Sequence, residues 1–170
     1  MTGRATGTRH GVAVDPDHRL PDGRRSLAGA VLLHPDGRVL LQLRDDKPGI
    51  EAPGMWSLFG GGLDEGETPV AGMLREVREE IGFGVRHYRP LVVYDGWGGR
   101  FHVYLAAVDE PLERLTLTEG AGFDYWDVPA ALAEPRLTAV GRLSLLALEA
   151  LREERARAGG AGELVPGAGY

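Results

Sequence analysis

An amphipathic helix that follows a glycine turn is the feature that most restricts what this chain can fold into. Apolar residues recur at spacings of four, three and four, at Val70, Leu74, Val77 and Ile81. This spacing places them on one side of a helix, where they form a single apolar stripe. Thr68 is a typical N-cap, Pro69 suits the first helical position, and Gly82 is a typical helix end. We therefore expect one helix between these signals.

The same helix carries a concentrated acidic face. At 100° per residue, Glu76, Glu79 and Glu80 share an arc next to the apolar stripe, away from Arg78. Like charges at such spacings each destabilise a helix by roughly 0.2–0.5 kcal/mol. One interpretation is a solvated face that Arg75 and Arg78 partly neutralise. The other is a site for a hard cation, because Mg²⁺ prefers carboxylate and phosphate oxygens.

Gly72 lies on the acidic side of the helix, one turn before Glu76. A glycine there leaves the helix surface bare, and we expect a ligand to approach at this point.

The rest of the chain predicts a mixture of strands and helices in one domain. Apolar or alternating runs predict strands at 26–34, 38–44, 55–62, 88–95, 101–108 and 123–128. A helical turn is expected at 129–134 and a long C-terminal helix at 138–158. We expect residues 1–25 to form a flexible arm, residues 26–158 to form the domain, and residues 159–170 to be disordered.

Composition excludes several classes of function. The formal net charge of −6 argues against long DNA or RNA as a partner, although a bound divalent metal could still attract a small phosphorylated ligand. The chain has no cysteine, which excludes disulfides, zinc–thiolate sites and cysteine nucleophiles. No signal peptide and no run long enough to cross a membrane is recognisable, so we expect a cytoplasmic protein without membrane contact.

The helix segment resembles the signature of the Nudix hydrolase family. From Gly61 there are five residues, then Glu67, then seven residues, and then the run Arg75-Glu76-Val77-Arg78-Glu79-Glu80-Ile81-Gly82-Phe83. Every fixed position of the family signature is filled over these 23 residues. The wider resemblance extends from about residue 27 to about residue 155.

This resemblance implies an α/β fold, an α/β/α sandwich with a mixed central sheet. It also implies hydrolysis of a diphosphate linked to another group, with Mg²⁺ or Mn²⁺ as cofactor. The implied metal ligands are Glu76, Glu79 and Glu80. Arg75 and Glu67 would orient these carboxylates through a salt bridge, and the backbone around Gly60 and Gly61 would reach the metal or the phosphates. Which glutamate activates the attacking water stays open.

Five residues outside the helix have two interpretations each. Glu119 resembles an acidic residue that reaches the site as a ligand or base in many relatives, but it could equally be an exposed loop residue. Arg44 could contact a phosphate or lie on the surface. Trp56 and Phe59 could stack on a base or pack in the core. Trp97 lies in a glycine turn, where it could be an aromatic residue of a binding loop or a turn residue without a role in binding.

The leading hypothesis is a metal-dependent pyrophosphohydrolase acting on a small soluble nucleoside di- or triphosphate derivative, including nucleotide sugars. The alternative is a non-catalytic module that senses a nucleotide. Removal of messenger-RNA caps would favour a basic surface, and the isopentenyl diphosphate isomerases that share the fold would need a catalytic cysteine. A homodimer is a common outcome in the family, and the sequence leaves the oligomeric state of this chain open.

Overall fold

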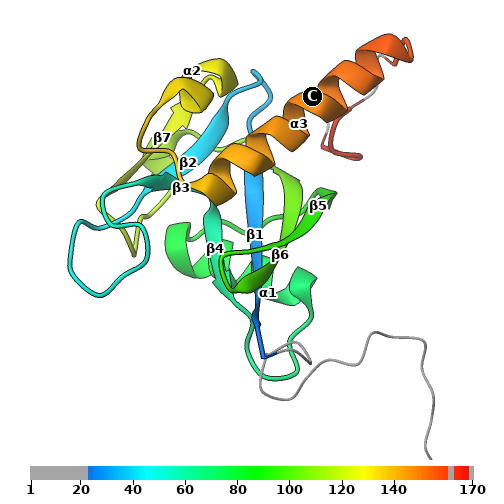
Figure 1. Ribbon diagram of the computed structural model, residues 1–170. Helices are drawn as coiled ribbons and strands as arrows, with labels where there is room; N and C mark the ends of the chain where they lie inside the picture. The colour runs from blue at the N-terminus through cyan, green and yellow to red at the C-terminus, as the bar shows by residue number, and fades with distance from the viewer. Residues whose placement is uncertain (1–22, 161–162, 169–170) are drawn as a thin grey trace, which may run out of the picture.

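A mixed seven-stranded sheet with helices on both faces forms the body of the protein (Figure 1). The computed structural model describes residues 23–160 and 163–168. The strands are β1 (Arg25–Leu33), β2 (Val39–Leu43), β3 (Trp56–Ser57), β4 (Phe59–Gly62), β5 (Tyr88–Gly96), β6 (Gly99–Ala107) and β7 (Gly122–Trp126). The helices are α1 (Pro69–Ile81), α2 (Val128–Ala133) and α3 (Ala139–Arg157), with a 3₁₀ turn, η1, at Leu112–Arg114. The predicted α/β/α sandwich with a mixed sheet is confirmed.

Strand β1 is the centre of the sheet. It pairs in parallel with β6 along its whole length, and β6 continues the sheet antiparallel to β5. On its other side β1 pairs antiparallel with β4 through residues 27–30 and with β2 through residues 32–33. Strands β3 and β7 then pair with β2. Two different strands therefore share one edge of β1, and β4 brings the segment before helix α1 into the sheet.

Helix α1 begins and ends at the predicted residues. The Thr68 side chain accepts a hydrogen bond of 3.2 Å from the Ala71 N–H, and Pro69 occupies the first helical position. Gly82 ends the helix in the left-handed conformation, with φ of 68°. Its N–H donates to the Arg78 carbonyl. A residue with a side chain would be strained at that φ, which explains the glycine at the helix end.

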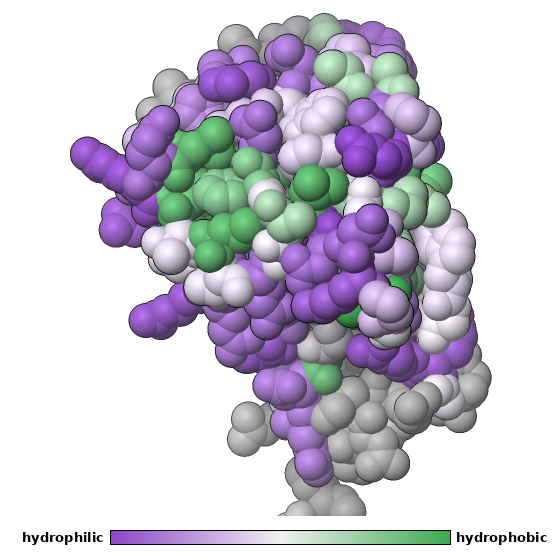
Figure 2. Space-filling model, turned by 90° about the vertical axis from the view of Figure 1, so that its left-hand side faces the viewer, coloured by the Kyte–Doolittle hydropathy of each residue, from purple (hydrophilic) through white to green (hydrophobic). Residues whose placement is uncertain are grey.

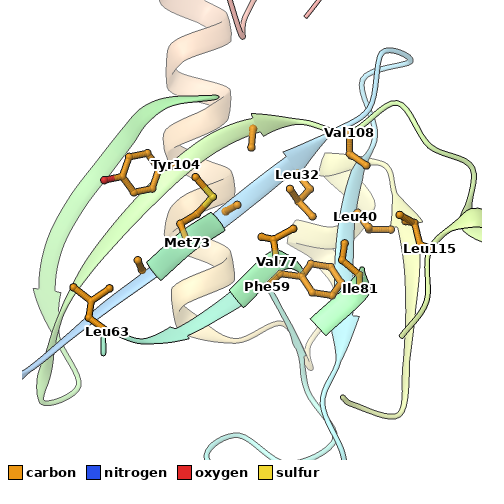
Figure 3. Packing of buried hydrophobic residues seen from close by; sticks show 13 residues of the cluster. Leu32, Leu40, Phe59, Leu63, Met73, Val77, Ile81, Tyr104, Val108 and Leu115 are labelled. Carbon is orange, nitrogen blue, oxygen red and sulfur yellow. The ribbon is translucent and has the colours of Figure 1, made fainter. Parts of the chain in front are cut away.

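Two hydrophobic clusters fill the spaces on the two faces of the sheet. The first lies between the sheet and α1, where Met73, Val77 and Ile81 meet Leu32 and Phe59 (Figure 3). The second lies between the sheet and α3 and includes Leu145 and Leu148 of that helix. Residues of β1 alternate between the clusters, so the sheet is covered on both faces. In Figure 1, α3 crosses one face and α1 lies behind the sheet.

The predicted strand over 55–62 is interrupted. Trp56–Ser57 pairs with β2, whereas Phe59–Gly62 pairs with β1. Leu58, between them, is buried in the second cluster. The chain thus passes from one neighbour in the sheet to another within one residue, a change of partner that an apolar run does not reveal.

The tail differs from the expectation of disorder where the structure describes it. Val165 is fully buried in the second cluster, with Leu164 and Ala168 packed against the same cluster. The Gly167 N–H donates a 2.8 Å hydrogen bond to the Glu163 carboxylate. Residues 161–162 and 169–170 lie outside the described residues, as does the expected arm up to residue 22. The described chain begins two residues before β1, so residues 23–25 continue directly into the sheet.

The face carrying α2 and the 44–55 loop has a hydrophobic area surrounded by hydrophilic residues (Figure 2).

Within the described residues, no helix is both long and apolar enough to cross a bilayer.

Candidate active site

Arg75 organises the acidic side of helix α1. Its Nε and Nη2 atoms donate to the two carboxylate oxygens of Glu67, at 3.0 and 2.9 Å. Its Nη1 atom donates to Glu76 at 2.9 Å and to Glu79 at 3.0 Å, and Nη2 also reaches the Gly62 carbonyl. The bidentate pair with Glu67 uses the planar geometry of the guanidinium, which a lysine could not reproduce. The salt bridge implied by the family signature is present.

The charges around Arg75 do not balance. Asp64, Glu67, Glu76 and Glu79 all lie within 3.3 Å of its guanidinium nitrogens, so one cation serves four carboxylates. The hydrogen bond with Glu67 is the largest cause of a strongly raised pKa for Arg75. Burial raises the pKa of Glu76, although Arg75 acts in the opposite direction. An excess of negative charge at a partly buried place favours binding of a further cation.

Glu80 points away from Arg75 and into the protein. Only 6% of this residue is exposed. Its carboxylate accepts a 2.9 Å hydrogen bond from the Gly60 N–H and a 3.2 Å hydrogen bond from the Gln42 side-chain amide. Burial raises the pKa of Glu80 to about 7, while these two hydrogen bonds lower it. The carboxylate is therefore tied to strand β4 at the point where the glycine pair begins.

The glycine pair permits a very close approach between β4, β1 and α1. A Cβ atom on Gly60, whose φ is 143°, would lie 2.3 Å from the Ala28 carbonyl oxygen. A Cβ atom on Gly61 would lie 2.6 Å from Oε1 of Glu76. Any side chain at either position would displace backbone or a carboxylate. The helix carboxylates thus lie directly against bare backbone, as the sequence predicts for this pair.

The loop before β7 brings Glu119 to the same region. Thr116 and Thr118 donate their backbone N–H groups to the Ile81 and Glu80 carbonyls at the end of α1. The Gln42 amide also donates to the carbonyl of Glu119, at 3.2 Å. The carboxylate of Glu119 is close enough to Glu76 and Glu80 to raise the pKa of both. The loop is therefore fixed to the helix end, and Glu119 shares its neighbourhood.

A polar cavity of about 380 Å³ lies between this loop and strand β2. It is lined by Glu80 and Glu119 and by two cationic side chains, Arg44 and Lys47. Lys47 donates a 2.6 Å hydrogen bond to Asp45. Phosphate oxygens and a divalent ion could both find partners among these side chains.

A second, larger cavity of about 620 Å³ lies on the α3 face of the sheet. Its lining is mainly apolar and includes Leu27, Met55, Leu58, Trp97 and Phe101. The backbone of Gly60 and Gly61 also borders it, and so does the start of α3. Arg44 borders both cavities, with its Nε atom held by the Glu51 carbonyl at 2.7 Å. A mainly apolar cavity and a charged cavity therefore meet at Arg44.

The two aromatic candidates on β3 and β4 have core positions. The Phe59 side chain is fully buried in the first cluster. Trp56 packs edge-on against Trp126, with ring centroids 4.9 Å apart, and is absent from the lining of the large cavity. Phe59 nevertheless borders the large cavity, while strand alternation directs both rings towards a hydrophobic cluster, the core position that is one of their two interpretations.

Gly72 and Gln42 show what sequence reasoning missed. Gly72 is buried, and a Cβ atom there would lie 2.3 Å from the Leu63 side chain. It makes room for the loop before the helix, so the expectation of bare helix surface for a ligand was wrong. Gln42 was overlooked, although a glutamine within the apolar run of β2 is a signal for a buried polar partner.

The residues present have the chemistry that a hard divalent ion requires. The donors are carboxylate oxygens, and the absence of a Gly61 side chain leaves room beside Glu76. As the side chains lie, no group of three His, Asp or Glu residues in the described ranges is gathered tightly enough to hold a metal ion. The reason is visible in the contacts: Glu76 and Glu79 turn towards Arg75, whereas Glu80 turns towards Gly60.

Comparison with known proteins places this site in a family. The family model described as the NUDIX domain matches residues 23–146. A MutT NUDIX hydrolase from Burkholderia pseudomallei has a similar structure, with a TM-score of 0.62 and 27% identity, over 74% of this chain and 97% of that chain. The chain belongs to the Nudix family, and its class is that of the Nudix pyrophosphohydrolases. The prediction of family, fold and enzyme class is confirmed.

Curated relatives in the same family carry a more specific name. A protein from Psychrobacter sp. (strain PRwf-1), named RNA pyrophosphohydrolase, is 38% identical over 127 residues, which cover 62% of this chain and 70% of that protein. One from Gluconacetobacter diazotrophicus with the same name is 44% identical over 61 residues, covering 34% of this chain and 36% of that protein. The chain thus spans 70% of the first relative and 36% of the second.

Proposed function

We propose that this protein hydrolyses a diphosphate linkage in a small nucleoside di- or triphosphate derivative, nucleotide sugars included, with Mg²⁺ or Mn²⁺ as cofactor. The observation that carries the proposal is the position of the Gly60–Gly61 backbone. It borders the large cavity and also contacts the carboxylates of Glu76 and Glu80. A substrate in the cavity would therefore meet the acidic side of α1 across backbone that carries no side chains.

Glu76, Glu79 and Glu80 are the proposed ligands of the divalent ion, with Glu119 as a further ligand or as the base. A bound divalent cation would attract the phosphate oxygens to this acidic surface and offset the charge that develops on them. Arg75 and Glu67 hold the carboxylates in place. Arg44 lies where it can contact a phosphate between the two cavities.

The reaction itself requires a water molecule and a base. A water attacks one phosphorus in line, one of the four carboxylates accepts its proton, and the bond from that phosphorus to the bridging oxygen breaks. The raised pKa values of Glu76 and Glu80 show that burial and neighbouring charges perturb this group of carboxylates. The assignment of the base among Glu76, Glu79, Glu80 and Glu119 stays open.

A triphosphate at an RNA 5′ end is the second candidate substrate. It is favoured by the Psychrobacter relative that is named RNA pyrophosphohydrolase. The net charge of −6 favours the smaller substrate instead, because an RNA chain adds phosphates that a basic surface would have to neutralise. For the same reason we propose that the enzyme acts on small phosphorylated molecules without contact with long nucleic acids. A cytoplasmic location without membrane contact, as expected from the sequence, completes the proposal.

Turnover of a panel with Mg²⁺ tests the proposal. The panel contains nucleoside triphosphates, oxidised nucleotides, ADP-ribose, nucleotide sugars, dinucleoside polyphosphates and a 5′-triphosphorylated RNA oligonucleotide. The variants Glu79→Gln and Glu119→Gln are measured beside the wild type. We expect one small-molecule class to be hydrolysed and Glu79→Gln to abolish this turnover, since it removes a proposed metal ligand.

The outcomes separate the alternatives. Hydrolysis of the RNA oligonucleotide alone would replace the small substrate by the second candidate. Binding of a nucleotide without turnover, and with equal affinity in Glu79→Gln, would identify a nucleotide-sensing module. Full activity in Glu119→Gln would remove Glu119 from the proposed site.

A further inference from the structure

The hairpin that joins β5 and β6 has an unexpected residue at its tip. Trp97 and Gly98 form a two-residue loop between the paired residues Gly96 and Gly99. Both loop residues have positive φ, 45° for Trp97 and 76° for Gly98, as in a type I′ turn. Asparagine, aspartate and glycine suit such positions, whereas a tryptophan is strained there. The requirements of the turn therefore do not account for the tryptophan.

Backbone strain in the described residues is concentrated at the large cavity. Two non-glycine residues in that part of the chain have positive φ, Ala52 and Trp97. Both belong to the lining of the 620 Å³ cavity, although they come from different loops. Strained conformations persist where the surrounding structure holds them, and they gather at sites that bind ligands.

The indole of Trp97 is exposed and its ring faces are not used in stacking with its aromatic neighbours. It is 62% exposed, the highest value among the large exposed hydrophobic residues described. Phe101 and Tyr94 meet it at interplanar angles of 77° and 90°, with centroids 6.2 Å away in each case. Phe101 and Tyr94 instead stack on one another at 16°. Neither contact of the indole is a parallel stack, and its exposed surface is available to a planar ligand.

The position of Trp97 matches a ligand that extends to the acidic site. Gly99, two residues after Trp97, lies opposite Arg25 on β1, and Gly61 lies opposite Ala28 on the other side of the same strand. The hairpin end and the glycine pair are thus about 10 Å apart along the strands and about 10 Å apart across them. A phosphorylated ligand with one end at Gly61 would have its other end near the indole.

We infer that Trp97 stacks on the planar base of the substrate, so that the substrate class is a nucleotide with an intact aromatic base. This inference rests on the proposed function and deepens it, because a hydrolase of base-free diphosphates would gain nothing from the indole. The mainly apolar cavity receives the base, and the phosphates lie at Gly60 and Gly61, beside the carboxylates of Glu76 and Glu80. Trp97 is then a specificity-determining residue.

The test measures binding of nucleotides apart from turnover. Trp97→Asn and Trp97→Phe are each combined with Glu79→Gln, and ADP, GDP, CDP and inorganic pyrophosphate are titrated by calorimetry in Mg²⁺. Asparagine removes the ring but favours the turn, so we expect the thermal stability to stay equal or to rise. We expect Trp97→Asn to raise the dissociation constants of the three nucleotides roughly 10-fold to 100-fold, as for loss of a stacked base. Pyrophosphate, which has no base, should bind as before.

The phenylalanine variant is the matched control. It retains an aromatic face at the same position, so the nucleotide dissociation constants should stay within about threefold of those of the Glu79→Gln parent. Equal nucleotide affinity in Trp97→Asn and the parent would overturn the inference, as would an equal loss of pyrophosphate binding. A Trp97→Asn protein that binds nucleotides normally but elutes as a monomer, where the wild type elutes as a dimer, would assign the indole to a subunit contact instead.

Failure of this inference differs from failure of the proposed function. If Glu79→Gln abolishes turnover while Trp97→Asn leaves nucleotide binding unchanged, the hydrolase stands and the base recognition falls. If the wild type hydrolyses no member of the panel, the proposed function falls whatever the Trp97 variants do.

Discussion

Glu80→Gln should stabilise the metal-free protein at neutral pH, because Glu80 is a carboxylate held in a poorly hydrated place. Glu80 is 6% exposed, and burial raises the pKa of its carboxyl group from 4.5 to about 7. Between these values the folded protein binds a proton at Glu80 that the unfolded chain has released. Stability of the wild type therefore falls as the pH rises from 4.5 to 7, and the whole penalty is present above pH 7.

The size of the effect follows from the same two pKa values. Their difference corresponds to about 3 kcal/mol, at about 1.4 kcal/mol for each pKa unit. The amide of glutamine is neutral at every pH and can still accept the hydrogen bond from the Gly60 N–H. We therefore expect the variant to gain stability relative to the wild type by about 2–3 kcal/mol between pH 5 and pH 8.

Urea denaturation of both proteins in EDTA, at pH 5 and at pH 8, measures this difference directly. The change in the difference between the two pH values reports on Glu80 together with its charge interactions with Glu76 and Glu119. A difference that stays constant with pH, or a variant less stable at pH 8, would refute the reasoning. Mg²⁺ should reverse the order, since an ion that binds the folded wild type stabilises it selectively.

Two further predictions concern the arginine and the tail. Arg75→Met should lower the catalytic efficiency about 10-fold to 100-fold, because the orienting partner of Glu76 and Glu79 is lost. Steady-state kinetics measures this change. An unchanged efficiency would show that the carboxylates need no arginine. Val165→Ala should lower the free energy of unfolding by about 1–2 kcal/mol, since Val165 is fully buried. Urea denaturation of the wild type and the variant measures this difference. An unchanged free energy of unfolding would mean that the tail adds nothing to the stability of the core.

Local signals predicted most of the fold. The caps Thr68 and Gly82 placed helix α1 correctly because they act through hydrogen bonds within a few residues. The split between β3 and β4 was missed because it depends on which strands β2 and β1 offer as partners. The packing of Val165 was missed for the same reason: a short apolar group in a glycine-rich tail gains its partners only in three dimensions.

In the site too, contacts between residues close in the sequence were predictable, whereas contacts between residues far apart in the sequence were not. The salt bridges between Arg75 and the acidic residues agree with the family signature, whose positions lie within one segment of fixed spacing. Gln42 lies 38 residues before Glu80 in the chain, and no local pattern connects the two. Gly72 was interpreted from the helix alone, whereas its neighbour Leu63 comes from the preceding loop. The aromatic candidates Trp56 and Phe59 depended on strand register, which the sequence left open.

The parallel pairing of β1 with β6 governs the order in which the chain can assemble. Arg25 lies opposite Gly99, 74 positions later, so this pairing closes a long loop before its contacts can form. The β5–β6 hairpin closes through a two-residue loop and can form early. On the ribosome, β2 and β4 are synthesised soon after β1 and can pair with one of its edges, whereas the other edge has no partner until β6 is made. Until then this edge is unpaired, and aggregation through it competes with folding during this interval.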